Sequence, residues 1–352
     1  MHSPRPARPL VFLSLLSLLA MAPGREAHAL KFHCIADLIR WKLTYFRANR
    51  ADPDSIPEDK LADLRDLPKR DLQTEPLARD FLKDHKIYVS VTTSPQRISR
   101  LPLVLSTLDL THVEEVVIAL PLAYGRDGSA YEIPPELYTL PKVRILRPEV
   151  DWGSATKLIP AADYVKSKGP NGVVVTIDDD IGYPNGMIDD LISFSARQPD
   201  SALGISGRRL GYYGIKPRNI FRPAPTAVAG KGESLVAVDL LQGYAGIAYP
   251  ADRLDTDLLK RWATQCVSCR TADDLIISMA LQKLGVPRYQ IRSPFYNPSR
   301  LLPFPYGMKG DAIHRSSGAS TQVSSTVRNH FASHYQKSYD AIADELTEKS
   351  VR

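Results

Sequence analysis

The chain has 352 residues, of which 43% are hydrophobic and 24% charged, a composition typical of a globular protein rather than a disordered one. Its formal net charge is +6, and the basic residues are scattered rather than gathered into one run, so nucleic acid is not an expected partner. A basic surface suits anionic donors or contact with a membrane surface. The cysteines are Cys34, Cys266 and Cys269, too few for a disulfide scaffold. Because no second pair accompanies Cys266 and Cys269, we expect two ordinary thiols or a local disulfide there.

Residues 1–29 have the pattern of a signal peptide or a membrane anchor. Arg5 and Arg8 precede an apolar stretch that is shorter than the roughly 20 residues of a bilayer span, and a small-x-small cleavage site follows at 27–29. We expect export or membrane association through this segment, with a cytoplasmic location as the alternative. Residues 30–85 predict a stem or linker that begins with an amphipathic helix and continues with prolines and alternating charges.

The folded core is expected to start near Lys86, where apolar strands begin to alternate with helical patterns. A first strand and its loop run from Ile87 to Pro95. Further strands are expected at 115–120, 142–146, 173–177, 202–206, 236–239 and 288–291, and helices at 97–108, 154–166, 185–198, 255–264 and 271–285. This alternation predicts an α/β fold with a mainly parallel sheet flanked by helices, in one domain over 86–328, followed by a C-terminal helix over 329–352.

The most informative stretch is the buried strand 173–177, which ends in Asp178, Asp179 and Asp180. Ligands of open α/β sheets bind beyond the carboxyl ends of the strands, so the acids stand where a site is expected. Side chains at i and i+2 share one face of an extended segment, so Asp178 and Asp180 can converge on one Mn²⁺ or Mg²⁺ ion while Asp179 points elsewhere. The alternative is a solvated acidic turn.

This Asp-x-Asp resembles the metal and nucleotide-sugar motif of the GT-A glycosyltransferases. The segments 151–160 (DWGSATKLIP) and 177–184 (IDDDIGYP) resemble, more specifically, a group of predicted bacterial glycosyltransferases of that superfamily. The resemblance implies a nucleotide-diphospho-sugar transferase fold and a metal-dependent, inverting transfer of a sugar from a nucleotide-sugar donor to an acceptor hydroxyl. Whether the acceptor is a glycan, lipid-linked or a protein stays open. Because bacterial nucleotide sugars are generally cytoplasmic, a cleaved signal peptide would be at odds with such a donor.

The same resemblance implies a set of donor-binding residues. They lie in the loop after the first strand, in the 151–157 segment, in the acidic motif and in a glycine loop: Thr92, Thr93, Arg97, Asp151, Lys157, Asp178, Asp179, Gly243 and Gly246. Lys157 would neutralise the diphosphate as a compact point charge. Local structure explains several of these equally well, since Thr92, Thr93 and Asp151 are ordinary capping residues and Gly243 and Gly246 suit a tight turn.

The helix expected at 271–285 carries Asp273 and Asp274 in its first turn, with Thr271 as N-cap and Gly285 at its end. Helix electrostatics alone explains both acids. The resemblance implies that Asp274 is the general base and Asp273 its neighbour, although the Asp-Asp pair departs from the commoner Glu-Asp. His314 stands where many GT-A enzymes carry a late metal ligand, but a lone histidine is usually not one.

Other functions remain open at this point. A nucleotidyltransferase would share the fold and the metal, but it would normally carry a Gly-rich loop with Arg or Lys after the first strand, where this chain has Thr-Thr-Ser-Pro at 92–95. A non-catalytic protein that binds a carbohydrate or a nucleotide sugar is the alternative outside enzymes.

Overall fold

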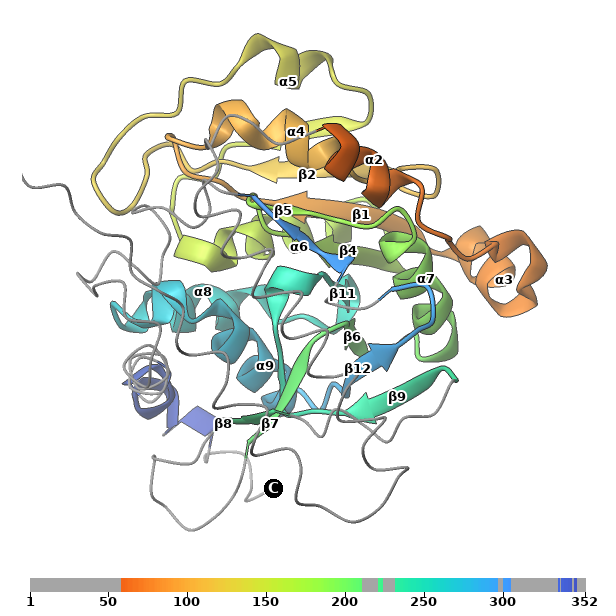
Figure 1. The fold of residues 1–352 in the computed structure, drawn as a ribbon. Helices are drawn as coiled ribbons and strands as arrows, with labels where there is room; N and C mark the ends of the chain where they lie inside the picture. Colours follow the sequence, from red (N-terminus) through yellow and green to blue (C-terminus); the bar gives the residue numbers. More distant parts are fainter. Residues whose placement is uncertain are drawn as a thin grey trace, which may run out of the picture. The chain divides into compact units, whose positions relative to one another are not determined.

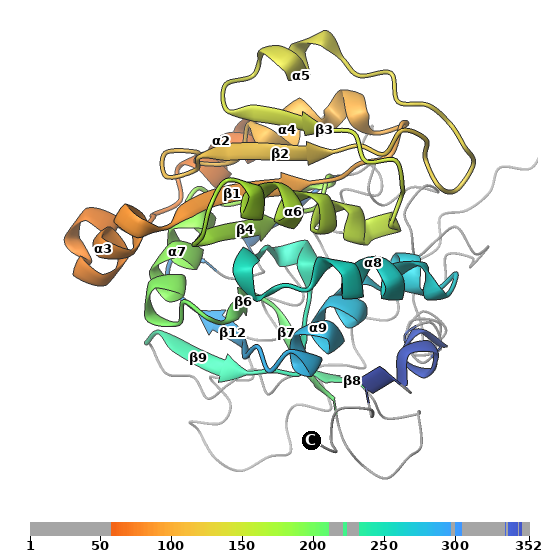
Figure 2. The same ribbon diagram turned by 180° about the vertical axis from the view of Figure 1, so that it is seen from behind.

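The computed structural model describes residues 58–210, 221–223, 232–296, 300–304, 335, 337–343 and 345–346. The expected signal segment, the amphipathic helix of the stem and His314 lie outside these residues. The fold is α/β, as predicted: an eight-stranded sheet in the order β3-β2-β1-β4-β11-β6-β12-β9 has helices on both faces (Figures 1 and 2). Within the described ranges, no helix combines the length and the apolar character needed to cross a membrane.

The sheet is mixed rather than uniformly parallel. Its strands are β1 (Lys86–Val91), β2 (Glu115–Ala119), β3 (Val143–Leu146), β4 (Gly172–Thr176), β6 (Ala202–Gly204), β9 (Ser234–Ala237), β11 (Ile247–Pro250) and β12 (Arg288–Arg292). β11 runs antiparallel to β4 and β6, and β9 antiparallel to β12. Because an antiparallel strand starts where its neighbour ends, the segment before Ile247 lies at the carboxyl end of β4.

Two small sheets accompany the large one. β5 (Ile181–Gly182) pairs with β13 (Leu302–Pro303), and β7 (Gly207–Leu210) lies between β8 (Phe221–Pro223) and β10 (Leu240–Leu241). The strand expected at 202–206 ends at Gly204 as β6, and β7, which belongs to a different sheet, begins just beyond the expected range.

The helices expected within 97–285 are present, although several are shorter, and α2, α3 and α5 lie outside the expected helix ranges. The α-helices are α2 (Glu58–Arg65), α3 (Pro76–Asp84), α4 (Leu101–Leu105), α5 (Pro135–Thr139), α6 (Ile159–Ser167), α7 (Met187–Arg197), α8 (Thr256–Gln265) and α9 (Asp273–Lys283). The short 3₁₀ segments are η1 (Leu72–Thr74), η2 (Ile98–Arg100), η3 (Gly153–Lys157), η5 (Gly243–Ala245), η6 (Ala251–Arg253) and η7 (Cys269–Thr271).

Two prolines explain why the predicted helices 97–108 and 154–166 are divided. Pro102 and Pro160 stand at the second positions of α4 and α6, where the missing N–H costs nothing. Inside a continuous helix each would remove a hydrogen bond and clash with the preceding turn, so a 3₁₀ segment comes first in both cases.

The predicted N-cap of α9 is wrong. Thr271 belongs to η7, and its hydroxyl donates to the carbonyl of Ser268 at 3.2 Å, so Ala272 precedes the helix without a side-chain cap. The predicted end of the helix is confirmed, since Gly285 follows the C-cap with φ of 69°.

Two hydrophobic clusters lie on the two faces of the sheet. In β4 and the residue after it, Val173, Val175 and Ile177 join the cluster that includes α4 and α7, whereas Val174 joins the one that includes α6, α8 and α9. Figure 2 shows these last three helices in front of the sheet. A strand covered on both faces explains the unbroken apolar run of the sequence.

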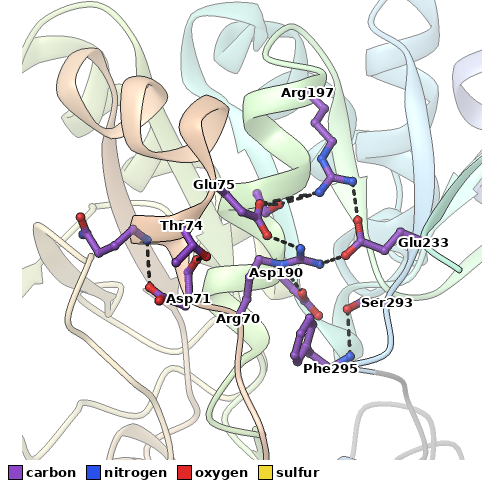
Figure 3. A network of polar contacts seen from close by, with 11 residues as sticks. Arg70, Asp71, Thr74, Glu75, Asp190, Arg197, Glu233, Ser293 and Phe295 are labelled. Atoms are coloured by element: carbon purple, nitrogen blue, oxygen red, sulfur yellow. Dashed lines mark hydrogen bonds and ion pairs between the residues drawn. The ribbon is translucent and has the colours of Figure 1, made fainter.

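Residues 58–85 are part of this fold, so the core begins before the expected Lys86. Leu61, Leu72 and Phe81 are buried in the same cluster as β1 and β4. The segment is also attached by charge, because the Arg70 guanidinium donates to Asp190 on α7 at 2.9 Å (Figure 3).

Candidate active site

The three aspartates lie at the carboxyl end of β4, beside the end of β1, but not in the expected arrangement. The strand stops at Thr176 and the chain turns, so the alternation of an extended segment does not extend to residues 178–180. Asp178 bonds Lys157, with Oδ1 and Nζ 2.7 Å apart. Asp179 and Asp180 share Arg97, whose Nη1 is 2.9 Å and 3.3 Å from their carboxylate oxygens.

Lys157 is the buried cation that joins two acidic segments. Its Nζ lies 2.7 Å from Asp178 and 3.1 Å from Oδ2 of Asp273, at the start of α9. The buried hydroxyl of Ser90, on β1, donates to the Lys157 carbonyl at 2.5 Å and fixes the end of η3. Burial alone would lower the pKa of Lys157, but the charges of Asp178 and then Asp273 outweigh it and hold that pKa well above its ordinary value.

Gly153 allows η3 to pack closely against η7. Gly153 has φ of 64°, and a Cβ there would lie 1.9 Å from the Arg270 carbonyl oxygen, so only glycine fits this contact. Cys266 and Cys269 form a local disulfide, one of the two expected states, in the turn that leads into η7. These contacts set the position of α9, and hence of Asp273, against Lys157.

Asp274 lies against the glycine turn η5. The Gly243 N–H donates to Oδ1 of Asp274 at 2.8 Å, and a Cβ on Gly243 would lie 3.1 Å from that oxygen and 3.2 Å from Lys157 Nζ. Burial, and next the charge of Asp273, raise the pKa of Asp274 to about 8. A carboxylate with a raised pKa is a stronger base than an ordinary aspartate.

Two buried tyrosines hold the turn in place. The Tyr183 hydroxyl accepts the Asp178 N–H at 2.8 Å and donates to the Tyr244 carbonyl at 3.1 Å. The Tyr296 hydroxyl donates to the Ala245 carbonyl at 2.9 Å. Sequence reasoning did not identify these roles, because both tyrosines stand in turn-like segments, IGYPN at 181–185 and PFYNP at 294–298. Their burial could not be read from such a pattern, and a buried tyrosine hydroxyl needs a partner.

The loop after β1 reaches the site through two of its three candidate residues. The Thr93 hydroxyl donates to Oδ2 of Asp179 at 2.5 Å, and Arg97 bonds the same carboxylate. The Thr92 hydroxyl instead donates to the Ala119 carbonyl at 2.7 Å, at the end of β2. Thr92 therefore joins two strands rather than facing the aspartates.

Asp151 and Gly246 shape the surrounding loops. Oδ2 of Asp151 accepts the Gly125 N–H at 2.6 Å, and Oδ1 accepts the Gly153 N–H at 2.7 Å, so both oxygens are occupied within the protein. Gly246 has φ of 87°, and a Cβ there would lie 3.1 Å from the Met187 sulfur, on the apolar side of the turn. In both cases the local structural explanation accounts for the residue.

Negative charge exceeds positive charge in this cluster, since Arg97 and Lys157 face five aspartates. Burial, and next the charge of Asp179, raise the pKa of Asp180 to about 7. Over the described ranges, no group of three or more His, Cys, Asp or Glu side chains is placed to hold a metal. A metal ion held only by Asp178 and Asp180 would have to take its other ligands from a diphosphate and water.

No protein-family model matches the chain, and no curated protein matches it. The chemistry of this site is therefore the basis for assigning a function.

Proposed function

We propose that the chain is a metal-dependent GT-A glycosyltransferase that moves a sugar from a nucleotide-diphosphate donor to an acceptor hydroxyl with inversion. One observation carries the proposal: Lys157 donates a hydrogen bond to Asp178, at the end of β4, and forms an ion pair with Asp273, at the start of α9. Acidic residues that are nearly 100 positions apart in the sequence therefore form one site. The site lies where α/β sheets bind ligands.

In this proposal the donor diphosphate lies beside the end of β4. Asp178 and Asp180 would hold Mn²⁺ or Mg²⁺, which when bound supplies Lewis-acid stabilisation of the leaving diphosphate. Lys157 can exchange a carboxylate partner for a phosphate oxygen without leaving its position at the end of η3, because an ammonium group bonds in several directions. Arg97 and Thr93 keep Asp179 and Asp180 in place from the β1 loop.

Asp274 is the proposed general base. It takes the proton of the acceptor hydroxyl while the acceptor oxygen bonds to the anomeric carbon of the sugar and the bond from that carbon to the diphosphate oxygen breaks. The Gly243 N–H orients one of its oxygens. Attack opposite the leaving group inverts the anomeric carbon.

Binding and turnover together test the proposal. We expect calorimetry to show that uridine or guanosine diphosphate binds only with Mn²⁺ or Mg²⁺. Asp180→Asn should weaken this binding at least about tenfold, because one of two charged ligands is lost. Asp274→Asn should keep binding and lower sugar transfer about 100-fold or more. Asp200→Asn, at an exposed carboxylate that bonds Arg253, is the control and should change neither.

The products decide between this function and its alternatives. Release of nucleotide diphosphate supports a glycosyltransferase, whereas release of pyrophosphate indicates a nucleotidyltransferase. Binding without turnover across a panel of donors indicates a non-catalytic protein that binds nucleotide sugars. Full metal-dependent binding by Asp180→Asn would contradict the metal assignment.

A further inference from the structure

Arg208, on β7, is a charged residue at the Asp274 side of the site, and no carboxylate in the described ranges forms an ion pair with it. Its Nε donates to Oε1 of Gln242 at 2.9 Å, and the same oxygen accepts the Ser206 hydroxyl at 3.0 Å. Within the described part of the chain, its two terminal Nη groups make no hydrogen bond or ion pair. Arg97 and Lys157 differ in this respect, since both bond aspartates.

A short series of contacts connects Arg208 to the proposed base. Gln242 directly precedes Gly243, whose N–H bonds Asp274, and Leu240 is the partner of Arg208 in the β7–β10 pair. Tyr244, which directly follows Gly243, donates its hydroxyl to the Ser206 hydroxyl at 3.2 Å. Ser206 bonds the same Gln242 oxygen that holds Arg208, so Tyr244 connects the Arg208 end of the series to the Asp274 end. Charges of both Arg208 and Asp274 act on the pKa of Tyr244, after the dominant effect of its burial. These contacts connect Arg208 to the part of the site that holds Asp274, where an acceptor would lose its proton in the proposed function.

The way in which Gln242 holds Arg208 favours recognition of an anion. A neutral amide holds Nε and limits rotation of the guanidinium without cancelling its charge. Among the described residues nothing bonds the two Nη groups, which can donate two parallel N–H···O bonds to one anion. Such a preorganised fork matches a carboxylate or a phosphate. An anionic molecule would otherwise be repelled by the surplus aspartates of the site.

We propose that Arg208 is a specificity-determining residue that binds an oxyanion, a carboxylate or a phosphate, on the acceptor. The inference rests on the proposed function, because it places the acceptor beside Asp274. It deepens that function by naming the substrate class: a hydroxyl-bearing acceptor with a negative charge near the reacting hydroxyl.

The next residue provides a matched control. Successive side chains of a strand point to opposite faces, and the exposed Arg209 donates from Nε to the Ala237 carbonyl at 3.2 Å instead of to Gln242. Arg208→Gln and Arg209→Gln remove the same charge from neighbouring positions. Only the first should affect the site. Thermal unfolding of both variants checks that each is folded.

The experiment measures binding of glucose, glucuronate and glucose 6-phosphate by ligand-observed NMR, with the protein saturated with diamagnetic Mg²⁺ and uridine or guanosine diphosphate, whichever binds. We expect one of the two anionic probes to bind about tenfold tighter than glucose, the effect of one charge-assisted bonding pair. The two probes distinguish a carboxylate from a phosphate. Arg208→Gln should abolish the preference, Arg208→Lys should restore part of it, and Arg209→Gln should keep it.

Three results would overturn the inference: no preference for either anion in the unaltered protein, an equal loss in Arg209→Gln, or an effect of Arg208→Gln on nucleotide binding instead of sugar binding. Failure of the proposed function has a different signature, since the protein would then bind no nucleotide diphosphate with Mn²⁺.

Discussion

At the scale of single residues, Asp189 shows how the fold itself can depend on pH away from the site. This carboxylate on α7 is 4% exposed and is not part of the aspartate cluster. Burial, and next the charge of Asp109, raise the pKa of Asp189 to about 7, although Lys69 opposes the shift. The folded protein therefore holds a proton on Asp189 at pH values where an unfolded chain has already released it.

The sign of the effect follows from this difference. The contribution of Asp189 to the free energy of unfolding is fully present below its ordinary pKa of 3.8 and is lost as the pH rises to about 7. We predict that Asp189→Asn, which cannot ionise, raises the free energy of unfolding by about 1–3 kcal/mol at pH 8 and gives no gain near pH 4. Urea unfolding at both pH values measures this, with Asp200→Asn as the exposed control. An equal effect at both pH values would contradict the assignment.

The sequence predicted the position of the acidic motif but not the contacts that its residues make. A triplet of acids after a buried strand was visible in the sequence, and the structure brings Lys157, Arg97 and Gly243 to it or beside it. The partners of each aspartate were not visible, because they depend on where the strand ends, and it ends before Asp178. The loop that begins at Arg208 could be predicted to face an acceptor from its arginines and tyrosines, but the bond that holds Arg208 could not, since Gln242 comes from another strand connection.

At the scale of elements, the turn η5 begins with Gly243 and is followed by Gly246, and the two glycines are needed for different reasons. Gly243 faces the site, where a Cβ would lie 3.1 Å from Asp274 Oδ1 and 3.2 Å from Lys157 Nζ. Gly246 faces Met187 and has φ of 87°, a conformation that strains any residue with a Cβ. Substitution of Gly243 should therefore affect the site, and substitution of Gly246 should affect the stability of the fold.

We predict that Gly243→Ala weakens metal-dependent nucleotide binding or transfer at least about tenfold, since a shift of a few tenths of an ångström disturbs the Lys157 and Asp274 contacts. Its free energy of unfolding should change by less than about 1 kcal/mol. Gly246→Ala should instead lower that free energy by about 1–2 kcal/mol. Denaturant unfolding and calorimetry on both variants measure the difference. Lost stability in Gly243→Ala together with lost nucleotide binding in Gly246→Ala would contradict the roles assigned to the two glycines.

Elements were predicted well where the pattern was local. The β-branched runs of β1, β2 and β4 and the apolar stripe of α9 gave their positions to within a few residues. Prolines divided two helices because a missing N–H overrides the apolar periodicity, and Pro102 is the clearer case. Thr271 failed as a cap because a 3₁₀ turn took its hydroxyl.

At the scale of the whole molecule, the α/β class followed from the alternation of strands and helices, but strand direction did not. β11 runs antiparallel to β4, and this reversal places η5 against Asp178 and Asp274. Pairing between distant strands depends on packing that a single sequence does not display. The attachment of residues 58–85 to the core was not predicted for the same reason. Their prolines and charges have the composition of a linker, and their packing depends on distant segments.

Ion pairs between distant segments account for that attachment. The Arg70 side chain is 4% exposed and bonds Asp190 on α7, which is fully buried, as well as Glu75 and Glu233, which precede α3 and β9 (Figure 3). Phe194 and Phe295 lie 5.7 Å and 5.0 Å from its guanidinium carbon, ring centroid to Cζ. One side chain thus connects the first described segment to the middle and the end of the fold.

We predict that Arg70→Met lowers the free energy of unfolding by about 3–5 kcal/mol, because it leaves the Asp190 carboxylate buried without its cation. Arg197→Met is the matched control: Arg197 also lies near Glu75 and bonds Glu233, but its side chain is 33% exposed and its loss leaves the Arg70–Asp190 pair intact, so about 1 kcal/mol is expected. Denaturant unfolding gives both values, and limited proteolysis should show faster cleavage within 58–85 for Arg70→Met alone. Equal costs for the two variants would mean that the network acts through Glu75 and Glu233 rather than through the buried pair that joins the segment to α7.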